Sequence, residues 1–252
     1  MHQDLHKEPM RSQGGPTGVV RSANLLIAEL IQSDFELINP HLRVLELSRN
    51  QMLAVAGDDL NLAYFPHGGI ISLMVRLIQG QATEVAMIGR QSAFGLAGAL
   101  GNRTASTTAQ VQMAGICSTL PIARLEEAAD RSKTLRATLF QHEQAIFIQA
   151  QQTAVCNISH PTVARLTRWL LRARDTAGSD DLQFSQEFLG QLLGVHRNAV
   201  SVVASVLREK GLIQFSRAHI RILDVDGLQG VACECYETVR DGLERMKGGP
   251  DN

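Results

Sequence analysis

The chain of 252 residues has little of what marks secreted, membrane-spanning or disordered proteins. Its four cysteines are too few and too scattered for a disulfide framework in a chain of this size. No apolar run reaches the roughly 18 residues that cross a bilayer, and the opening MHQDLHKEPMRSQGGPTG lacks the apolar core of a secretory signal. Charged residues make up only 19% of the chain and hydrophobic ones 44%, which is a globular composition. We therefore expect a globular, cytoplasmic protein without a membrane partner.

The sequence also lacks the motifs of an enzyme. It contains no nucleophile elbow, phosphate loop, metalloprotease motif or close pair of carboxylates. We therefore expect no catalytic site, no metal and no cofactor.

The net charge of −1 argues against a nucleic-acid partner only until its distribution is considered. Residues 160–222 carry nine basic and five acidic side chains and are net +4, whereas residues 223–252 are net −4. A phosphate backbone responds to local charge, because salt confines these fields to about 10 Å. Residues 160–222 are thus a candidate for binding nucleic acid.

The first half of the chain has the pattern of a β domain. Residues 1–22, polar and glycine-rich, are expected to form a flexible arm. Between Leu42 and Leu120, short apolar runs such as RVLEL and IISLMVRLI alternate with glycine turn signals, which is typical of a sandwich or barrel. We expect a helical lead-in at 25–39 and a β domain that ends near residue 131.

After Pro121 the pattern becomes helical, with a short helix at 122–129 and a long one at 132–158 that no glycine or proline interrupts. One stripe of the long helix recurs at alternating steps of four and three, the period of a coiled-coil seam. We expect it to be the dimer seam, and a second stripe at Phe140, Phe147 and Ala154 to pack on the β domain. The alternative is one helix buried in its own monomer. The predicted seam consists of Leu135, Leu139, His142, Ile146, Gln149 and Thr153, with Cys156 following in register.

Residues 184–213, FSQEFLGQLLGVHRNAVSVVASVLREKGLI, indicate two short helices joined at a glycine. Ser185 can cap the first helix, and Gln186 lies in its first turn. Gly190 lies inside that helix at a cost of about 1 kcal/mol relative to alanine, which predicts close approach by the second helix. Gly194 supplies the left-handed residue that ends the first helix.

The second helix, from about His196 to Lys210, has one apolar and one polar face. The polar face carries the groups that read base edges, because arginine pairs with guanine, asparagine with adenine and a methyl group with thymine. Residues 212–224, LIQFSRAHIRILD, then indicate two strands of a basic wing. The combination predicts a winged helix-turn-helix that binds double-stranded DNA. The residues expected to contact DNA are Ser185, Gln186, His196, Arg197, Asn198, Ser201, Val202, Ser205, Arg217 and His219.

In this order of parts the chain resembles the Crp/Fnr family of bacterial transcription regulators over almost its whole length. The strongest match is SQEFLGQLLGVHRNAVSVVASVLREKGLI with the preceding RLTRWLL. The resemblance implies an α+β fold: a cyclic-nucleotide-binding-like β-roll (a jelly roll) at 23–131, a dimerisation helix at 132–158, a winged helix-turn-helix at 159–230, and a C-terminal helix and tail at 231–252. It also implies a homodimer on a palindromic operator, contact with RNA polymerase, and a small-molecule effector.

The resemblance places base reading at Arg197, Asn198, Ser201 and Val202. Family members that read a TGTGA-like or TTGAT-like half-site usually have glutamate where this chain has Asn198. The operator is therefore not inherited from those relatives.

The effector segment, FGLAGALGNRTASTTAQV, departs from members that bind cyclic AMP. Those members carry a glutamate for the ribose and an arginine for the cyclic phosphate. Here Leu96 stands at the glutamate position, Thr107 at the arginine position, and Arg103 is four residues out of register. No cysteine precedes Cys117, which excludes the N-terminal iron-sulfur cluster of the Fnr branch. The resemblance thus implies a pocket that does not bind cyclic AMP, formed by Phe94, Gly95, Leu96, Arg103, Thr107 and Thr108.

We predict a sequence-specific, homodimeric transcription regulator with an allosteric or degenerate effector domain. Two alternatives remain open: a second-messenger or small-molecule binding module with weak or no specific DNA readout, and a constitutive regulator without a ligand. Cys233 and Cys235 are expected on a C-terminal helix, where positions two apart point about 200° from each other. This favours structural packing of these cysteines over a metal site. A disulfide between Cys156 and its twin across the seam is a minor alternative.

Overall fold

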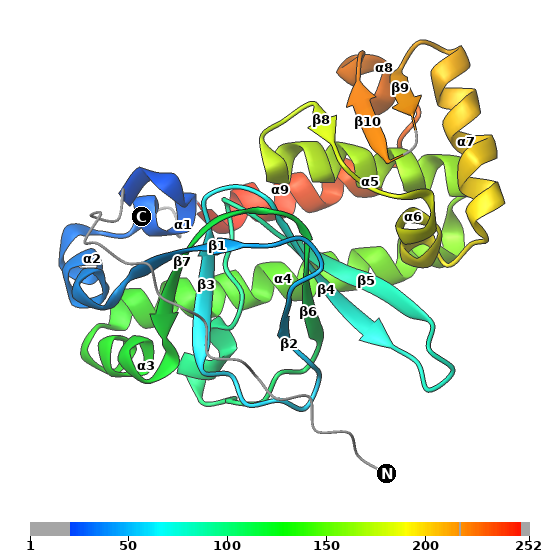
Figure 1. The fold of residues 1–252 in the computed structure, drawn as a ribbon. Helices are drawn as coiled ribbons and strands as arrows, with labels where there is room; N and C mark the ends of the chain where they lie inside the picture. Colours follow the sequence, from blue (N-terminus) through cyan, green and yellow to red (C-terminus); the bar gives the residue numbers. More distant parts are fainter. Residues whose placement is uncertain (1–20, 217, 248–252) are drawn as a thin grey trace.

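The computed structural model describes residues 21–216 and 218–247. The expected arm at 1–22 therefore falls almost wholly outside the described residues, as does Arg217. Figure 1 shows a β domain and a smaller, mainly helical domain. The long helix α4 (Lys133–Ser159) runs along the β domain and leads into the helical one.

The chain enters the β domain through short helical segments. Asn24 caps the first α-helix, its Oδ1 accepting the backbone N–H of Ile27 at 3.2 Å. Its Nδ2 donates to the carbonyls of Pro66 and Ser92 at 2.8 and 3.0 Å, which ties the lead-in to the sheets. The segments are η1 (Arg21–Ala23), α1 (Leu25–Glu29), α2 (Gln32–Ile38) and η2 (Asn39–His41).

Two antiparallel sheets make up the β domain, with strand orders β1-β7-β3 and β2-β6-β4-β5. The burial of β5 alternates along its first five residues, as expected when one face of a strand meets the core. Between β5 and β6 the chain forms the 3-10 helix η3 (Leu96–Leu100). The strands are β1 (Arg43–Leu47), β2 (Met52–Ala54), β3 (Leu62–Pro66), β4 (Ile70–Arg76), β5 (Ala82–Ile88), β6 (Thr108–Met113) and β7 (Gly115–Pro121).

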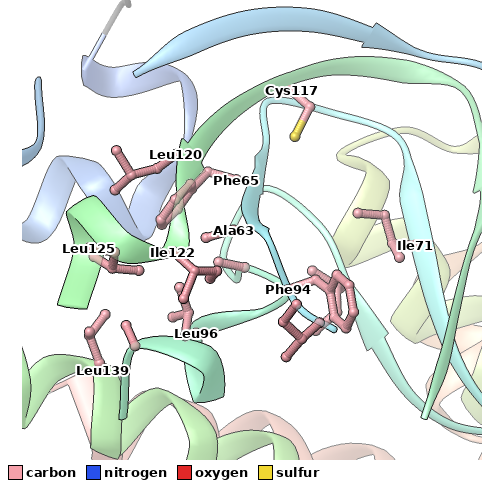
Figure 2. Packing of buried hydrophobic residues seen from close by; sticks show 14 of the residues in the cluster. Ala63, Phe65, Ile71, Phe94, Leu96, Cys117, Leu120, Ile122, Leu125 and Leu139 are labelled. Atoms are coloured by element: carbon pink, nitrogen blue, oxygen red, sulfur yellow. The ribbon is translucent and has the colours of Figure 1, made fainter. Parts of the chain in front are cut away.

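The core of this domain lies between the sheets and the helices beneath them. Figure 2 shows Leu120 of β7, Leu96 of η3, Leu125 of α3 (Ile122–Arg131) and Leu139 of α4 converging on one cluster. Each of these side chains is at most 2% exposed. Apolar burial therefore holds α3 and α4 against the β domain.

Polar contacts fix the start of α4, and a proline fixes its end. Ser132 caps the helix by accepting the backbone N–H of Leu135 at 3.1 Å, and its hydroxyl donates to Asp34 at 2.6 Å. At the other end His160 is the C-cap, in extended backbone, because Pro161 follows and disfavours helical geometry at the residue before it.

The helical domain is a winged helix-turn-helix with α5 as its base. Its sheet has the order β8-β10-β9, and β9 and β10 pair as the wing. Trp169 and Phe184 pack edge to face in its core, with ring centroids 4.7 Å apart. The elements are α5 (Thr162–Ala177), β8 (Asp181–Leu182), α6 (Gln186–Leu193), α7 (Arg197–Glu209), β9 (Ile213–Ser216) and β10 (His219–Ile222).

After the wing, the chain returns to α4. The short helix α8 (Val225–Gln229) is followed by α9 (Cys235–Lys247), which packs on α4 and α5. At Gly242 a Cβ would lie 3.6 Å from Cγ2 of Ile148, so the two helices touch closely there. Within the described ranges, no helix combines the length and the apolar character needed to span a membrane.

Candidate nucleic-acid interface and effector cavity

Two glycines set the geometry of the helix-turn-helix, as the sequence predicts. Gly194 ends α6 in the left-handed conformation, with φ of 63°. A Cβ on Gly190 would lie 2.9 Å from the carbonyl oxygen of Val195 and 3.3 Å from the backbone N of Arg197. Glycine at 190 thus allows the turn and the start of α7 to lie directly against α6.

Helix α7 has a buried face and an exposed face. Val200, Ala204 and Leu207 are buried in the core of the helical domain. Arg197 and Asn198 are exposed, and Val202 is 66% exposed. Figure 1 shows α7 at the outer edge of the domain, on the side away from the β domain. The helix therefore presents guanidinium, carboxamide and methyl groups to the exterior.

Several predicted contact residues also hold the motif together. Ser185 caps α6 by accepting the N–H of Phe188 at 3.1 Å, and Nδ1 of His196 caps α7 by accepting that of Asn198 at 3.3 Å. Ser201 donates to Oε1 of Gln186 at 2.8 Å, which joins α6 to α7. Ser205 is half-buried on α7.

The wing carries less free positive charge than its sequence suggests. His219 and Arg221 on β10 lie 3.3 and 3.8 Å from the carboxylate of Asp181 on β8. Arg217, predicted to contact DNA, lies outside the described residues. Asp181 thus competes with phosphates for the side chains of His219 and Arg221.

A buried carboxyl group joins the helical domain to the β domain. Glu84 of β5 accepts a hydrogen bond from Nε1 of Trp169 on α5 at 2.6 Å and another from Ser72 on β4. Burial raises the pKa of Glu84 to about 7, although these hydrogen bonds and the charges of Arg168 and Arg172 act to lower it. Sequence reasoning missed this residue, because its partners lie in distant segments.

A cavity of about 480 Å³ lies between the β domain and α4. Of the predicted pocket residues, Phe94, Gly95 and Thr107 line it. The others do not: Leu96 is buried in the core, Arg103 forms an ion pair with Glu126, and the hydroxyl of Thr108 accepts the N–H of Ala56. Arg103 thus offers no charge to a phosphate in the cavity.

The remaining wall of the cavity is mainly apolar and hydroxylic. Among the described residues, Glu143 is its one charged lining residue, and Leu73, Val85 and Ile146 supply apolar surface. Sequence reasoning missed the residues that α4 contributes. The lining residues from α4 are Glu143, Gln144, Ile146, Phe147 and Ala150.

The predicted dimer seam on α4 faces the chain's own interior, which corrects the expected assignment of faces. Leu135, Leu139, His142 and Gln149 are buried within the single chain, while Ile146 and Thr153 are half-buried. His142 accepts the backbone N–H of Ala93 through Nε2 at 3.1 Å. Side chains that are buried within one chain cannot form the contact surface for a second.

A different stripe of α4 is exposed. It includes Phe140 and Phe147, expected to pack on the β domain but 58% and 57% exposed. Its members are again spaced by alternating steps of three and four. They are Ala137, Phe140, Gln144, Phe147, Gln151, Ala154 and Ile158.

The C-terminal cysteines also differ from expectation. Cys233 precedes α9 and Cys235 begins it, so the argument from helical spacing does not apply. Both thiols face the end of α4, where Sγ of Cys156 lies 3.5 Å from that of Cys233. Cys156 is therefore turned into the chain rather than toward a twin.

Two family models match the chain in tandem. A cyclic nucleotide-binding domain matches residues 44–132, and a Crp-like helix-turn-helix domain matches residues 164–231. None of the curated proteins matches the chain significantly.

Three solved structures illustrate the similarity in fold. FixK2 from Bradyrhizobium japonicum is 16% identical with a TM-score of 0.67, over 76% of this chain and 98% of its own. The c-di-GMP responsive global regulator CLP from Xanthomonas campestris is 14% identical with a TM-score of 0.63, over 77% and 100%. A CRP-family transcriptional regulator from Thermus thermophilus is 22% identical with a TM-score of 0.59, over 75% and 96%.

At these identities the structural likeness shows the fold, and the two matched domains add the family. The cyclic nucleotide-binding domain and the helix-turn-helix domain follow each other in one chain, and the likeness to FixK2 spans 76% of that chain. The exposed helix α7 belongs to the matched helix-turn-helix. The chain therefore belongs to the Crp/Fnr family of DNA-binding transcription regulators.

Proposed function

We propose that the protein is a homodimeric, sequence-specific transcription regulator that places α7 in the major groove of a palindromic operator. The observation that carries this is the two-sided α7: Val200, Ala204 and Leu207 are buried on one face, while Arg197, Asn198 and Val202 remain exposed on the other. Helices of this kind read base edges with their N-terminal residues. Ser201 and Gln186, already bonded to each other, position the helix and offer polar groups to the DNA.

A dimer follows from the exposed stripe on α4. Phe140, Phe147 and Ile158 are large apolar side chains in contact with solvent, and their heptad spacing suits a coiled-coil seam. A parallel pair of such helices would place two copies of α7 on half-sites one helical turn apart, about 34 Å. Regulation then acts on the access of RNA polymerase to a promoter.

The effector is proposed to be a small, largely apolar molecule without a phosphate. The cavity has the size of a small-molecule site, but Glu143 would repel an anion and Arg103 is paired elsewhere. Gln144 and Phe147 belong both to the lining of the cavity and to the exposed stripe of α4. An occupant of the cavity would therefore act directly on the dimer contact proposed for that stripe. Cyclic AMP is not expected to bind.

Selection from random DNA tests the proposal. We expect the purified protein to enrich a palindrome, and Arg197→Ala to lower affinity for the selected site by about 10-fold or more, since a bidentate base contact is worth about 1–3 kcal/mol. Arg124→Ala is the matched control, because Arg124 is exposed on α3 of the β domain and its loss removes the same charge far from α7 (Figure 1).

Two outcomes would count against this assignment. Failure to enrich any palindrome would favour a ligand-binding module with weak DNA readout. Unchanged selectivity of Arg197→Ala in a footprint would show that α7 is not the reading helix.

A further inference from the structure

Four potential metal ligands meet where α4 ends and α9 begins. Cys156 and His160 lie one turn apart at the end of α4, while Cys233 and Cys235 lie at the start of α9. One ligand atom from each, three Sγ and one imidazole nitrogen, all lie within 4.8 Å of one another. Neither the DNA-binding face nor the cavity uses these residues.

Two separations within the cluster match those around a tetrahedral ion. With zinc bonds of about 2.3 Å to sulfur and about 2.0 Å to nitrogen, neighbouring sulfurs lie roughly 3.8 Å apart, and sulfur and nitrogen roughly 3.5 Å apart. Sγ of Cys156 and Sγ of Cys233 are 3.5 Å apart, and Sγ of Cys235 lies 3.6 Å from Nδ1 of His160. A disulfide requires about 2.05 Å between its sulfurs. The thiols are thus spaced as ligands of a common centre.

The imidazole is oriented for metal binding. Nδ1 of His160 faces Cys235, and Nε2 lies 3.2 Å from Oε1 of Glu234. A carboxylate at the outer nitrogen holds the proton there and leaves the lone pair of the inner nitrogen free, as is usual for metal-bound histidines. Nε2 of Gln152 donates to Sγ of Cys235 at 3.0 Å and so holds that sulfur in place.

The surroundings can also balance the charge of a loaded site. Three thiolates, a neutral imidazole and a divalent ion carry a net charge of −1. Arg168 of α5 is only 7% exposed, and in the described part of the chain its Nε has no hydrogen-bond partner. The guanidinium charge of Arg168 lies near Cys156. An anionic metal centre would give this buried guanidinium a counter-charge on the side of Cys156.

We propose that Cys156, His160, Cys233 and Cys235 form a structural binding site for a thiophilic divalent metal ion, with Zn²⁺ as the best fit. Binding forms three Zn–S bonds and one Zn–N bond, and the three thiols release three protons. Four protein ligands leave no coordination position for a substrate, so the site is structural rather than catalytic.

The position of the site gives it a role in the architecture. The helical domain begins at Pro161, directly after His160, and the metal would tie the end of α4 to the segment that follows the wing. It would thus clamp the helical domain to α4 at both of its ends. Resting on the proposed function, this clamp would set the position of α7 relative to the dimer helix, and loss of the metal would lower operator affinity.

Metal analysis tests the site without any DNA. The reduced full-length protein is expected to retain one Zn²⁺ per chain by plasma mass spectrometry, and to bind Co²⁺ with the visible absorption bands of tetrahedral thiolate coordination. Cys156→Ser and Cys235→Ser should abolish both signals. Cys117→Ala is the matched control, because it removes a buried cysteine from β7 of the β domain.

A substitution at the surface, which leaves the core intact, complements the cysteine variants. The side chain of Glu234 is 75% exposed, so Glu234→Gln changes the partner of His160 without touching the core. Its affinity for Zn²⁺, measured by competition with a chromophoric chelator, should fall by about 10-fold or more. Glu237→Gln, also exposed near the start of α9, should leave the affinity unchanged.

Three outcomes would overturn the proposal. These are the absence of stoichiometric Zn²⁺ and Co²⁺ in the reduced protein, full retention of metal by both serine variants, and a Cys156–Cys233 disulfide found in place of the metal. Since metal content is read without DNA, a protein that binds Zn²⁺ but no operator would refute only the proposed function.

Discussion

Among single residues, Glu84 has the most unusual environment. It is buried between the domains, with Ser72 and Trp169 bonded to its carboxyl group and Arg168 and Arg172 nearby. Burial is the largest influence and raises its pKa from 4.5 to about 7. The folded protein therefore holds the Glu84 proton more tightly than the unfolded chain does, and this contribution to stability is complete below about pH 4.5 and lost as pH rises through about 7.

Glu84→Gln should remove this pH dependence. The amide oxygen of glutamine can still accept from Trp169, and its NH₂ group can donate to the Ser72 hydroxyl. Because glutamine never ionises, we expect little change at pH 5 and a gain in the free energy of unfolding of up to about 3 kcal/mol at pH 8. Urea denaturation at both pH values measures the difference in the free energy of unfolding between variant and wild type. Because both proteins contain the same histidines, the titration of these residues cancels in that difference. Glu46→Gln, exposed on β1, should give no such difference. An equal effect of Glu84→Gln at pH 5 and pH 8 would contradict the raised pKa.

Whether the role of a residue can be predicted from sequence depends on how close its partners lie along the chain. Gly190 and Gly194 could be interpreted correctly because the atoms that constrain them lie within seven residues. Glu84 and its Trp169 partner are 85 positions apart, and Cys156 and Cys233 are 77 apart, so no local pattern connects them. The local signals of the proposed metal site were the spacing of Cys156 and His160, four residues apart, and that of Cys233 and Cys235, two apart.

Among the elements, α4 shows what periodicity can and cannot determine. Its length and its heptad spacing could be predicted from sequence, but two stripes share that spacing, and the pattern does not say which one meets the β domain. Which stripe is buried depends on the surface of the β domain that α4 meets. Leu135 and Leu139 fill the apolar core beneath η3 and α3. The other stripe has glutamines at 144 and 151, and their amides would be buried there without hydrogen-bond partners.

Phe140→Glu should therefore separate the dimer. The substitution places a carboxylate on each side of the proposed seam, and its repulsion and desolvation should weaken self-association by at least 10-fold. Sedimentation of the purified protein over a range of concentrations measures this change. Leu77→Glu is the matched control, because it puts the same charge on a side chain of similar exposure in the β4–β5 turn. A variant that dimerises as tightly as wild type would place the interface elsewhere.

For the whole molecule, the distribution of charge matters more than its sum. The chain is net −1, but its positive excess lies in residues 160–222, the part that contains α7 and the wing. Figure 1 places α7 on the side of the helical domain away from the β domain. At physiological salt the acidic remainder is screened beyond about 10 Å. Arg168 and Arg172 are buried, so the cations left for DNA are the exposed ones, among them Arg197, Arg208 and Lys210.

Operator binding should therefore depend steeply on salt concentration, although the net charge of the chain is −1. If a dimer neutralises about six phosphates, the logarithm of the association constant falls with the logarithm of salt concentration with a slope of about −5, which is roughly a 10³-fold loss between 50 and 200 mM. Fluorescence anisotropy with the selected palindrome measures the slope. Arg221→Gln, at a wing cation 3.8 Å from Asp181, should make the slope only slightly shallower, because that charge is already partly neutralised. A slope near zero would mean that the surface around α7 does not contact phosphates, and that the helical domain binds a partner other than DNA.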